Sequence, residues 1–294
     1  MKRKAAIFKF IEEHEGQFPV TLMIDTIGEV SRSGYYKWKK EKATRPTQEE
    51  KDDELLTEML ILYKKHRGTL GNLRFKLALE NEFRRIVNHK RIARMRHAYR
   101  MPLLTVRRRP VSKTSKEHCI VGNLLNRNFK ASRPGIKYCI DISYLEIKKP
   151  KKDFLYLCAI KDLYNNEIVS YRIGKYMNLK LVLDTVRGLK EKGPENGAII
   201  HSDQGSQFTS PIYSQELKSL GFVQSMSRRG NCWDNACIES FFGKLKTELP
   251  AFSIPETKTE MIQAVSEYIS YYNEERPQLK LKISPVEYRQ SNAA

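Results

Sequence analysis

The chain of 294 residues is 40% hydrophobic, which is enough for one substantial core and one or two smaller units, since domains usually span roughly 100–200 residues. Its 53 Lys and Arg outnumber 34 Asp and Glu, and the formal charge of +19 favours a polyanionic partner, nucleic acid first. The sequence contains no signal peptide and no apolar run near the ~20 residues of a membrane span, so we expect a cytoplasmic protein that binds no membrane.

The five cysteines are odd in number, and none form a pair at the two-residue spacing of zinc ribbons. Cys232 and Cys237 are close enough in sequence to raise the question of a metal site, but no paired histidines lie near them. We therefore expect small buried thiols in a reducing compartment, with zinc ligation as the alternative.

The N-terminal residues 1–45 are predicted to form a small helical segment. Short apolar groups alternate with charges over residues 7–40, and an aromatic cluster closes the pattern at residues 35–38. The following residues, 39–53, are rich in charge and contain Pro46, so we expect a linker there.

A helix-turn-helix-like DNA-binding region is predicted over residues 50–106. Apolar side chains after Glu54 follow a helical period until Gly68, and a basic helix follows the expected N-cap Asn88. The first 110 residues hold 26 basic and 14 acidic side chains, so this shorter part of the chain is the more cationic. A solvated basic face is the alternative to DNA binding. The expected DNA contacts on the basic helix are Lys90, Arg91 and Arg94.

A second basic segment, residues 107–133, is expected to be a linker at a domain boundary. It begins with Arg107, Arg108 and Arg109, followed by Ser, Lys and Asn residues. Such a tract can lie across phosphates without a core of its own, so we expect these three arginines to contact DNA.

From residue 134 the apolar pattern changes to the period of strands. The predicted strands are residues 135–147, 154–160, 167–173, 198–201 and 222–226, with helices at residues 178–192 and 210–220 and a further helix around residue 239. This order is that of an α/β ribonuclease-H-like domain with a mixed five-stranded sheet, although several mixed sheets share it. We expect this catalytic core over residues 134–250 and a helical tail over residues 251–294.

Two aspartates lie at informative places in these strands. Asp141 is in the middle of an apolar and aromatic strand, where Asp is disfavoured, and the alternative is a charge on the solvent face of an edge strand. Asp203 ends the fourth strand, where mixed sheets place ligands, and the alternative is a turn or cap residue. His201 lies close to Asp203 and is expected to support it or to be structural. Two other acids, Asp162 and Asp184, are given solvated or capping roles.

Glu239 belongs to a helix that Asp234 can cap. Helical spacing puts Glu239 and Lys246 on one face, so the carboxylate can face a metal while Lys246 reaches a phosphate. A solvent-facing pair is the alternative. Phosphoryl transfer by the two-metal route requires carboxylates that converge on two Mg²⁺ ions, which prefer oxygen ligands.

The spacing of the three acids is characteristic: Asp141 and Asp203 are 62 positions apart, and 35 residues separate Asp203 from Glu239. This pattern resembles the Asp, Asp, thirty-five-residue gap, Glu signature of retroviral-integrase-like transposases. The closer resemblance is to the catalytic second-frame protein, OrfB, of bacterial insertion sequences, although the Trp that this family usually has shortly before the first Asp is absent. The segments that carry the resemblance are residues 33–38, 66–71, 88–91, 201–208, 234–242, 244–248, 271–277 and 284–288.

The resemblance implies a DDE transposase whose triad Asp141, Asp203 and Glu239 binds two Mg²⁺ ions, with Mn²⁺ as a substitute. It further implies DNA strand cleavage and strand transfer on terminal inverted repeats and target DNA, within a multimeric protein–DNA complex and with an upstream-frame partner protein or a fusion to it. The alternatives are a nuclease that cleaves without joining, and a relic transposase that binds DNA as a repressor.

The remaining expected DNA contacts, around the Glu239 helix, are Arg228, Arg229, Trp233, Lys244 and Lys246, with core packing as the alternative for Trp233.

Overall fold

The computed structural model describes residues 2–44, 48–105, 121–125, 128–147, 153–228 and 235–292. Packing divides the chain into two compact units, Met1–Thr57 and Glu58–Ala294, and each is described by itself. The five-part division proposed from the sequence remains a prediction. None of the helices in the described ranges is long and apolar enough to cross a membrane.

The first unit is helical, as predicted, with helices α1 (Lys2–His14), α2 (Val20–Ile27) and α3 (Arg32–Thr44). Its small core is formed by Ile11, Met23, Ile24 and Tyr35. The Tyr35 hydroxyl donates a 2.7 Å hydrogen bond to Glu15.

The prediction of a linker over residues 39–53 is wrong for most of that range. Helix α3 continues to Thr44 and helix α4 (Gln48–Lys65) begins soon afterwards. The linker was predicted from the high charge of this segment. Lys, Glu and Ala are good helix formers, however, so a charged composition does not exclude a helix.

The second unit begins with the helical region that was predicted to bind DNA. Helices α5 (Asn72–Phe83) and α6 (His89–Ala98) follow the end of α4. The Asn88 side chain caps α6, as predicted, by accepting a hydrogen bond from the backbone N–H of Lys90. Ile92 and Met95 are buried on this helix, as expected, whereas Tyr99 is 46% exposed because α6 ends one residue earlier.

A five-stranded sheet in the order β3-β2-β1-β4-β5 forms the centre of the unit. The strands β1, β2 and β3 are antiparallel, and β4 and β5 extend the sheet in parallel from β1. The strands are β1 (Lys137–Ile147), β2 (Asp153–Asp162), β3 (Ile168–Gly174), β4 (Ile199–Ser202) and β5 (Val223–Met226). The helices are α7 (Leu179–Lys190), α8 (Pro211–Ser219), α9 (Ala236–Glu248), α10 (Lys258–Glu274) and α11 (Pro285–Ser291). This topology confirms the predicted ribonuclease-H-like fold.

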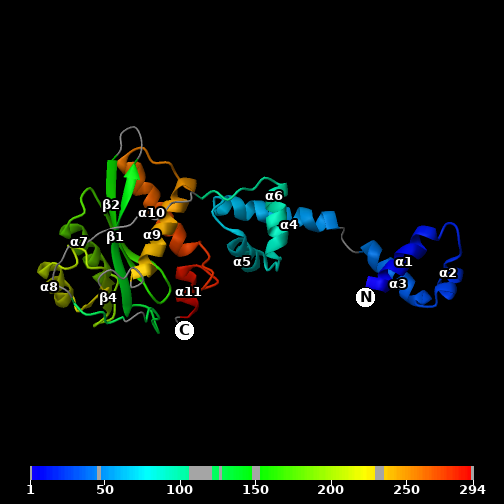
Figure 1. The fold of residues 1–294 in the computed structure, drawn as a ribbon, viewed down its shortest axis with the longest axis horizontal. Helices are drawn as coiled ribbons and strands as arrows, with labels where there is room; N and C mark the ends of the chain where they lie inside the picture. Colours follow the sequence, from blue (N-terminus) through cyan, green and yellow to red (C-terminus); the bar gives the residue numbers. More distant parts are fainter. Residues whose placement is uncertain are drawn as a thin grey trace. The chain divides into compact units, whose positions relative to one another are not determined.

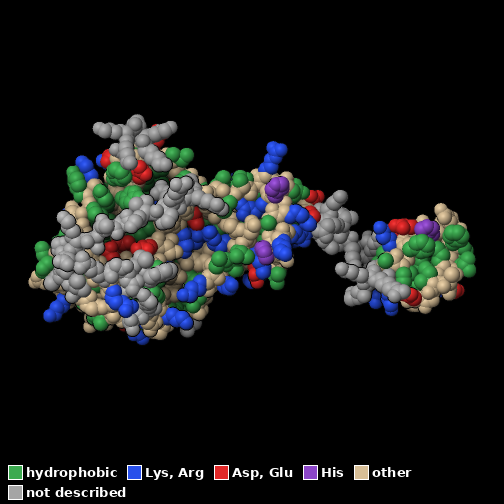
Figure 2. All heavy atoms as spheres, in the orientation of Figure 1, with side chains coloured by type: hydrophobic (Ala, Val, Ile, Leu, Met, Phe, Trp, Pro, Cys, Tyr) green, Lys and Arg blue, Asp and Glu red, His purple; other side chains and the backbone are tan. Residues whose placement is uncertain are grey.

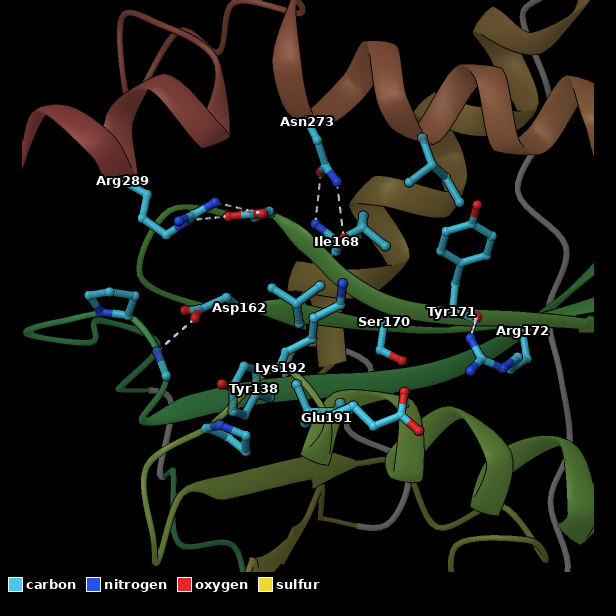
Figure 3. Close-up of a pocket in the computed structure, with 18 of the residues that line it drawn as sticks. Tyr138, Asp162, Ile168, Ser170, Tyr171, Arg172, Glu191, Lys192, Asn273 and Arg289 are labelled. Carbon is cyan, nitrogen blue, oxygen red and sulfur yellow. Dashed lines mark hydrogen bonds and ion pairs between the residues drawn. The ribbon is translucent and has the colours of Figure 1, made fainter. Parts of the chain in front are cut away.

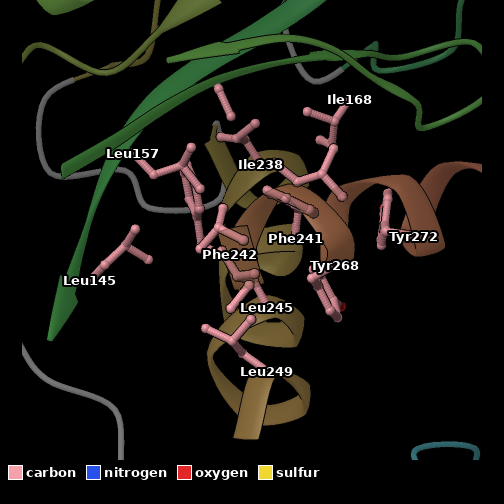
Figure 4. Packing of buried hydrophobic residues seen from close by; sticks show 14 of the residues in the cluster. Leu145, Leu157, Ile168, Ile238, Phe241, Phe242, Leu245, Leu249, Tyr268 and Tyr272 are labelled. Atoms are coloured by element: carbon pink, nitrogen blue, oxygen red, sulfur yellow. The ribbon is translucent and has the colours of Figure 1, made fainter. Parts of the chain in front are cut away.

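Helices cover both faces of the sheet (Figure 1). On one face, Ile140 and Ile160 pack with α7 and α8. On the other face, Leu145 and Leu157 pack with α9 and α10, where Phe241 is fully buried (Figure 4). Because alternate residues of a strand point to opposite faces, the odd-numbered residues of β1 face α9 and α10.

A buried ion cluster joins the helical region to the core. Both oxygens of the Glu248 carboxylate, at the end of α9, accept hydrogen bonds from the Arg276 guanidinium, at 2.8 and 2.7 Å. The Tyr268 hydroxyl donates to the same carboxylate at 3.0 Å. Arg74 on α5 donates from 3.2 Å, so this cluster ties α5 to α9 and α10.

Candidate functional site

Asp141 lies in the centre of the sheet. Its strand, β1, has neighbours on both sides, so the alternative of an edge strand is wrong. The side chain is half-buried, and its Oδ1 accepts a 2.7 Å hydrogen bond from the backbone N–H of Ile142. Cys139, two residues before it, packs in the cluster with α9 and α10, so strand alternation directs Asp141 to the same face.

Asp203 follows the last residue of β4 and is level with Asp141. The parallel pairing of β1 with β4 sets Cys139 opposite His201, an offset of 62 residues, and the same offset separates Asp141 from Asp203. Paired residues of parallel strands point to the same face, so both aspartates face the layer that contains α9. The predicted meeting of the first two acids follows from this register.

The turn after β4 fixes the position of the Asp203 carboxylate. Asp203 Oδ1 accepts a 2.9 Å hydrogen bond from the backbone N–H of Gly205. A Cβ atom at Gly205 would lie 2.9 Å from that same oxygen, closer than real Cβ contacts come. Glycine is therefore required if the Asp203 carboxylate is to keep this position.

His201 is fully buried and structural rather than part of an open site. Its Nδ1 lies 2.8 Å from the Ser225 hydroxyl and its Nε2 lies 3.1 Å from the Ser227 hydroxyl. Gln204 Nε2 also donates to the Ser227 carbonyl at 2.9 Å. These contacts hold the end of β4 against the end of β5, and sequence reasoning missed both serines, although their spacing of two at a strand end was a usable signal.

Glu239 lies in the first turn of α9 and is exposed. The helix begins after Asn235, which occupies the N-cap position, and Asp234, the expected cap, lies outside the described residues. A carboxylate in the first turn is stabilised by the helix dipole. Within the described ranges, no three His, Cys, Asp or Glu side chains are gathered closely enough to hold a metal ion. The register thus sets Asp141 and Asp203 on the same face of the sheet, and Glu239 lies on a helix that packs on that face.

The two lysines expected to contact DNA from α9 lie on different sides of it. At 3.6 residues per turn, Lys244 and Lys246 point about 200° apart. The Lys246 ammonium lies 3.9 Å from the ring centroid of Tyr144 on β1. Lys244 instead lines a cavity of about 720 Å³, here called the basic pocket. The polar side chains that line the basic pocket include Arg74, Lys161, Lys244, Arg276, Gln278 and Lys280.

No contact between described residues connects the other predicted DNA-binding residues with Asp141 or Asp203. On α6, Lys90 and Arg94 are exposed and Arg91 is half-buried, and Arg228 is exposed after β5. Lys and Arg side chains gather over α5 and α6 in Figure 2. The predicted contacts that lie outside the described residues are Arg107, Arg108, Arg109, Arg229 and Trp233.

A further cavity with titratable groups lies away from the aspartate pair. It has a volume of about 910 Å³ and is lined by Asp162, Arg172 and Arg289 among others (Figure 3). Asp162 is 3% exposed and accepts hydrogen bonds from the backbone N–H groups of Gly135 and Tyr164, so the expected capping role is confirmed and a solvated role is wrong. Asp184 is paired on the surface with Lys180.

The cysteines in the described ranges are free thiols. Cys139 and Cys158 are buried, and Cys237 is half-buried. Burial raises the pKa of the Cys158 thiol to about 12, so it stays protonated. Cys139 and Cys158 are therefore the predicted buried thiols, Cys237 is only half-buried, and Cys119 and Cys232 lie outside the described residues.

Comparison with known proteins now identifies the family. Models of the integrase core domain match residues 131–232 and 239–292. The chain is 37% identical over 230 residues to the InsK transposase of insertion sequence element IS150 from Escherichia coli K12, covering 78% of this chain and 80% of that protein. It is 32% identical over 254 residues to the transposase of insertion sequence element IS904 from Lactococcus lactis, covering 85% of this chain and 99% of the relative. The chain belongs to the transposases of bacterial insertion sequences.

As an insertion-sequence transposase with an integrase core, the chain is a polynucleotidyl transferase of the DDE class, which confirms the function inferred from its motifs. Among solved structures, it is similar to a chain of the simian T-cell lymphotropic virus intasome in complex with a PP2A regulatory subunit. That similarity has a TM-score of 0.49 at 15% identity, over 69% of this chain and 67% of the other. It is remote, and the family assignment does not depend on it.

Proposed function

We propose that this transposase cuts and joins DNA strands with Asp141, Asp203 and Glu239 as its catalytic carboxylates. The observation that supports the proposal is the parallel register of β1 and β4, whose offset of 62 residues, extended by two positions, sets Asp203 level with Asp141 on one face of the sheet. Glu239 extends from α9, the helix that covers that face. The substrates are the inverted repeats at the ends of the element and a target DNA.

The residues fit a hard divalent cation. All three donors are carboxylates, the ligands that Mg²⁺ and Mn²⁺ prefer, and the two aspartates are held by short hydrogen bonds from backbone N–H groups. Asp141, Asp203 and Glu239 would hold two Mg²⁺ ions, with Mn²⁺ as a substitute. When bound, such ions activate the attacking oxygen and stabilise the leaving oxygen.

Neighbouring residues hold the Asp203 carboxylate in position for the reaction. Gly205 leaves the space that the Asp203 carboxylate needs, and the buried His201 holds the end of β4 in place. Water, or the 3′-hydroxyl of a DNA strand, attacks a phosphodiester in line, first to free the element's end and then to join it to the target. No covalent bond to the protein is formed in either step.

The DNA is held by basic side chains around this centre. We propose phosphate contacts for Lys246, whose ammonium lies over the ring of Tyr144 on β1, for Arg228 and for the α6 residues Lys90, Arg91 and Arg94. Since the substrate is chromosomal DNA, the protein would act in the cytoplasm at the nucleoid. Self-association and an upstream-frame partner that recognises the inverted repeats complete the proposal. The contacts predicted outside the described residues stay predictions.

The test is Mg²⁺-dependent cleavage and joining of labelled element-end DNA by the wild type, Asp203→Asn and Glu239→Gln, with and without the upstream-frame fusion. We expect both variants to lose activity by about 10³-fold or more, because the metals supply several kcal/mol of transition-state stabilisation. Asp184→Asn, which alters a surface acid on α7, is the matched control and should keep full activity.

Three outcomes would contradict the proposal. Cleavage without joined products in every format would indicate a nuclease. DNA binding without any cleavage, equal in the wild type and the variants, would indicate a repressor. Full activity of Glu239→Gln would remove Glu239 from the catalytic set.

A further inference from the structure

The basic pocket brings cations together from four separate parts of the chain. Arg74 comes from α5, Lys161 from the end of β2, Lys244 from α9, and Arg276 and Lys280 from the segment after α10. The acid nearest to them, Glu248, already binds Arg276 and Arg74. In the described part of the chain, Lys161, Lys244 and Lys280 have no carboxylate partner, so the pocket has a net positive charge.

Two polar side chains of the basic pocket, Lys161 and Gln278, are buried and have hydrogen-bond donors without an acceptor. The Lys161 side chain is 3% exposed, and the bond from its ammonium to the Cys237 carbonyl, at 2.9 Å, uses only one of its three protons. Gln278 is 7% exposed, and its side-chain Nε2 has no hydrogen-bond partner among the described residues. A buried donor without an acceptor costs about 1–3 kcal/mol, so both side chains favour an acceptor bound in the pocket.

The charge state of Lys244 supports the same reading. Burial, together with the neighbouring charges of Arg276, Lys161 and Arg74, lowers the pKa of Lys244 to about 8, although the charge of Glu248 acts to raise it. Like charges held this close repel one another. An anion in the pocket would relieve that repulsion.

The pocket is separate from the aspartate pair. The buried stripe of α9, which includes Phe241 and Leu245, packs on the sheet. At about 100° per residue, Glu239 and Lys246 extend from one flank of this stripe, and Ser240 and Lys244 from the other. The two flanks therefore offer two different sites on one helix.

We propose that the basic pocket is a second phosphate site, which binds a backbone phosphate of the DNA on the flank of α9 opposite to Glu239. The proposal rests on the proposed function, because it makes DNA the source of the phosphate. The open cavity and its origin in four segments suit a phosphate on a long strand, and Arg74 belongs to the same helical region as the basic helix α6. The contacts are to phosphate, so they do not depend on base sequence.

The test measures binding of a labelled mixed-sequence DNA duplex by fluorescence anisotropy over a series of salt concentrations, with EDTA present. Without metal no cleavage occurs, so the result is independent of the catalytic triad. The variants are Lys244→Gln, Lys280→Gln and their double, with Lys218→Gln on α8 as the control of equal charge change. Each pocket lysine that binds a phosphate should lower the slope of log affinity against log salt by about 1, and the double by about 2. Lys244→Arg should keep the wild-type slope.

Gln278→Met separates a binding role from a structural one. It removes an unpaired buried donor, so the thermal stability should stay equal or rise, while the affinity for DNA should fall several-fold. A slope for Lys244→Gln equal to that of Lys218→Gln would overturn the proposal. So would an unchanged DNA slope together with calorimetric binding of inorganic pyrophosphate that Lys244→Gln abolishes, since the pocket would then bind a free phosphate anion.

Discussion

Two buried carboxylates in this transposase, Glu248 and Asp162, are equally shielded from water but differ in charge behaviour. They are 2% and 3% exposed, respectively. Burial acts to raise the pKa of Glu248, but the hydrogen bonds and charge of Arg276, together with Arg74, outweigh it and the pKa is lowered. Burial also acts on Asp162, whose bonds are to backbone N–H groups, and there the pKa is raised to about 6 (Figure 3).

The difference shows that a cationic partner, rather than the degree of burial, decides whether a buried carboxylate stays ionised. It also bears on the search for catalytic groups, because perturbed acids are often functional. Asp162 has a raised pKa, yet its carboxylate accepts a hydrogen bond from the backbone N–H of Gly135, just before β1. Asp203, level with Asp141, is identified by register and motif instead.

The largest effect is expected from removing the charge of Glu248. Glu248→Gln would leave the guanidinium groups of Arg276 and Arg74 buried without an anion, and breaking a buried pair in this way costs about 3–5 kcal/mol. Urea unfolding measures the change. Glu267→Gln, which removes the acid of an exposed ion pair between α10 and Arg67, should cost less than about 1 kcal/mol. Equal stability of the two variants would refute the central role of Glu248.

The next effect concerns pH and Asp162. Because the pKa in the fold, about 6, lies above the ordinary value of 3.8, protonation of Asp162 stabilises the fold fully below about pH 4. This contribution, about 3 kcal/mol, is lost as the pH rises through about 6. Asp162→Asn cannot ionise, so its stability relative to the wild type should increase over this pH range. Urea unfolding at several pH values measures it, and a pH-independent difference would contradict the raised pKa.

The sequence predicted the strand order and the aspartates but not these ion clusters, and the reason is physical. Strand alternation and the position of Asp203 at a strand end are local properties, so Asp141 was placed correctly within its strand, while β4 ends one residue before Asp203. The pairing of Glu248 with Arg276 and Arg74 joins residues 28 and 174 positions apart, which no local pattern encodes. The basic pocket was missed for the same reason, since only tertiary packing brings its cations together.

A smaller loss of stability is expected when the hydrogen bond from α5 to Glu248 is removed. Arg74→Gln removes one charged hydrogen bond to Glu248 while Arg276 still neutralises the carboxylate, so the loss should be about 2 kcal/mol. The measurement is again urea unfolding, with hydrogen exchange of α5 to locate the change. A loss as large as that of Glu248→Gln would mean that Arg276 alone cannot neutralise the acid.

The smallest effect distinguishes two neighbouring tyrosines of α10. The Tyr268 hydroxyl donates to Glu248, so Tyr268→Phe should cost about 1 kcal/mol. The Tyr272 hydroxyl is equally buried but has no partner in the described part of the chain, so Tyr272→Phe removes an unsatisfied polar atom and should be neutral or stabilising. Both changes delete one oxygen and leave the ring packing intact, so their difference in unfolding free energy isolates the bond to Glu248. If the two variants were equally stable, that bond would contribute nothing, and the two arginines alone would account for the lowered pKa of Glu248.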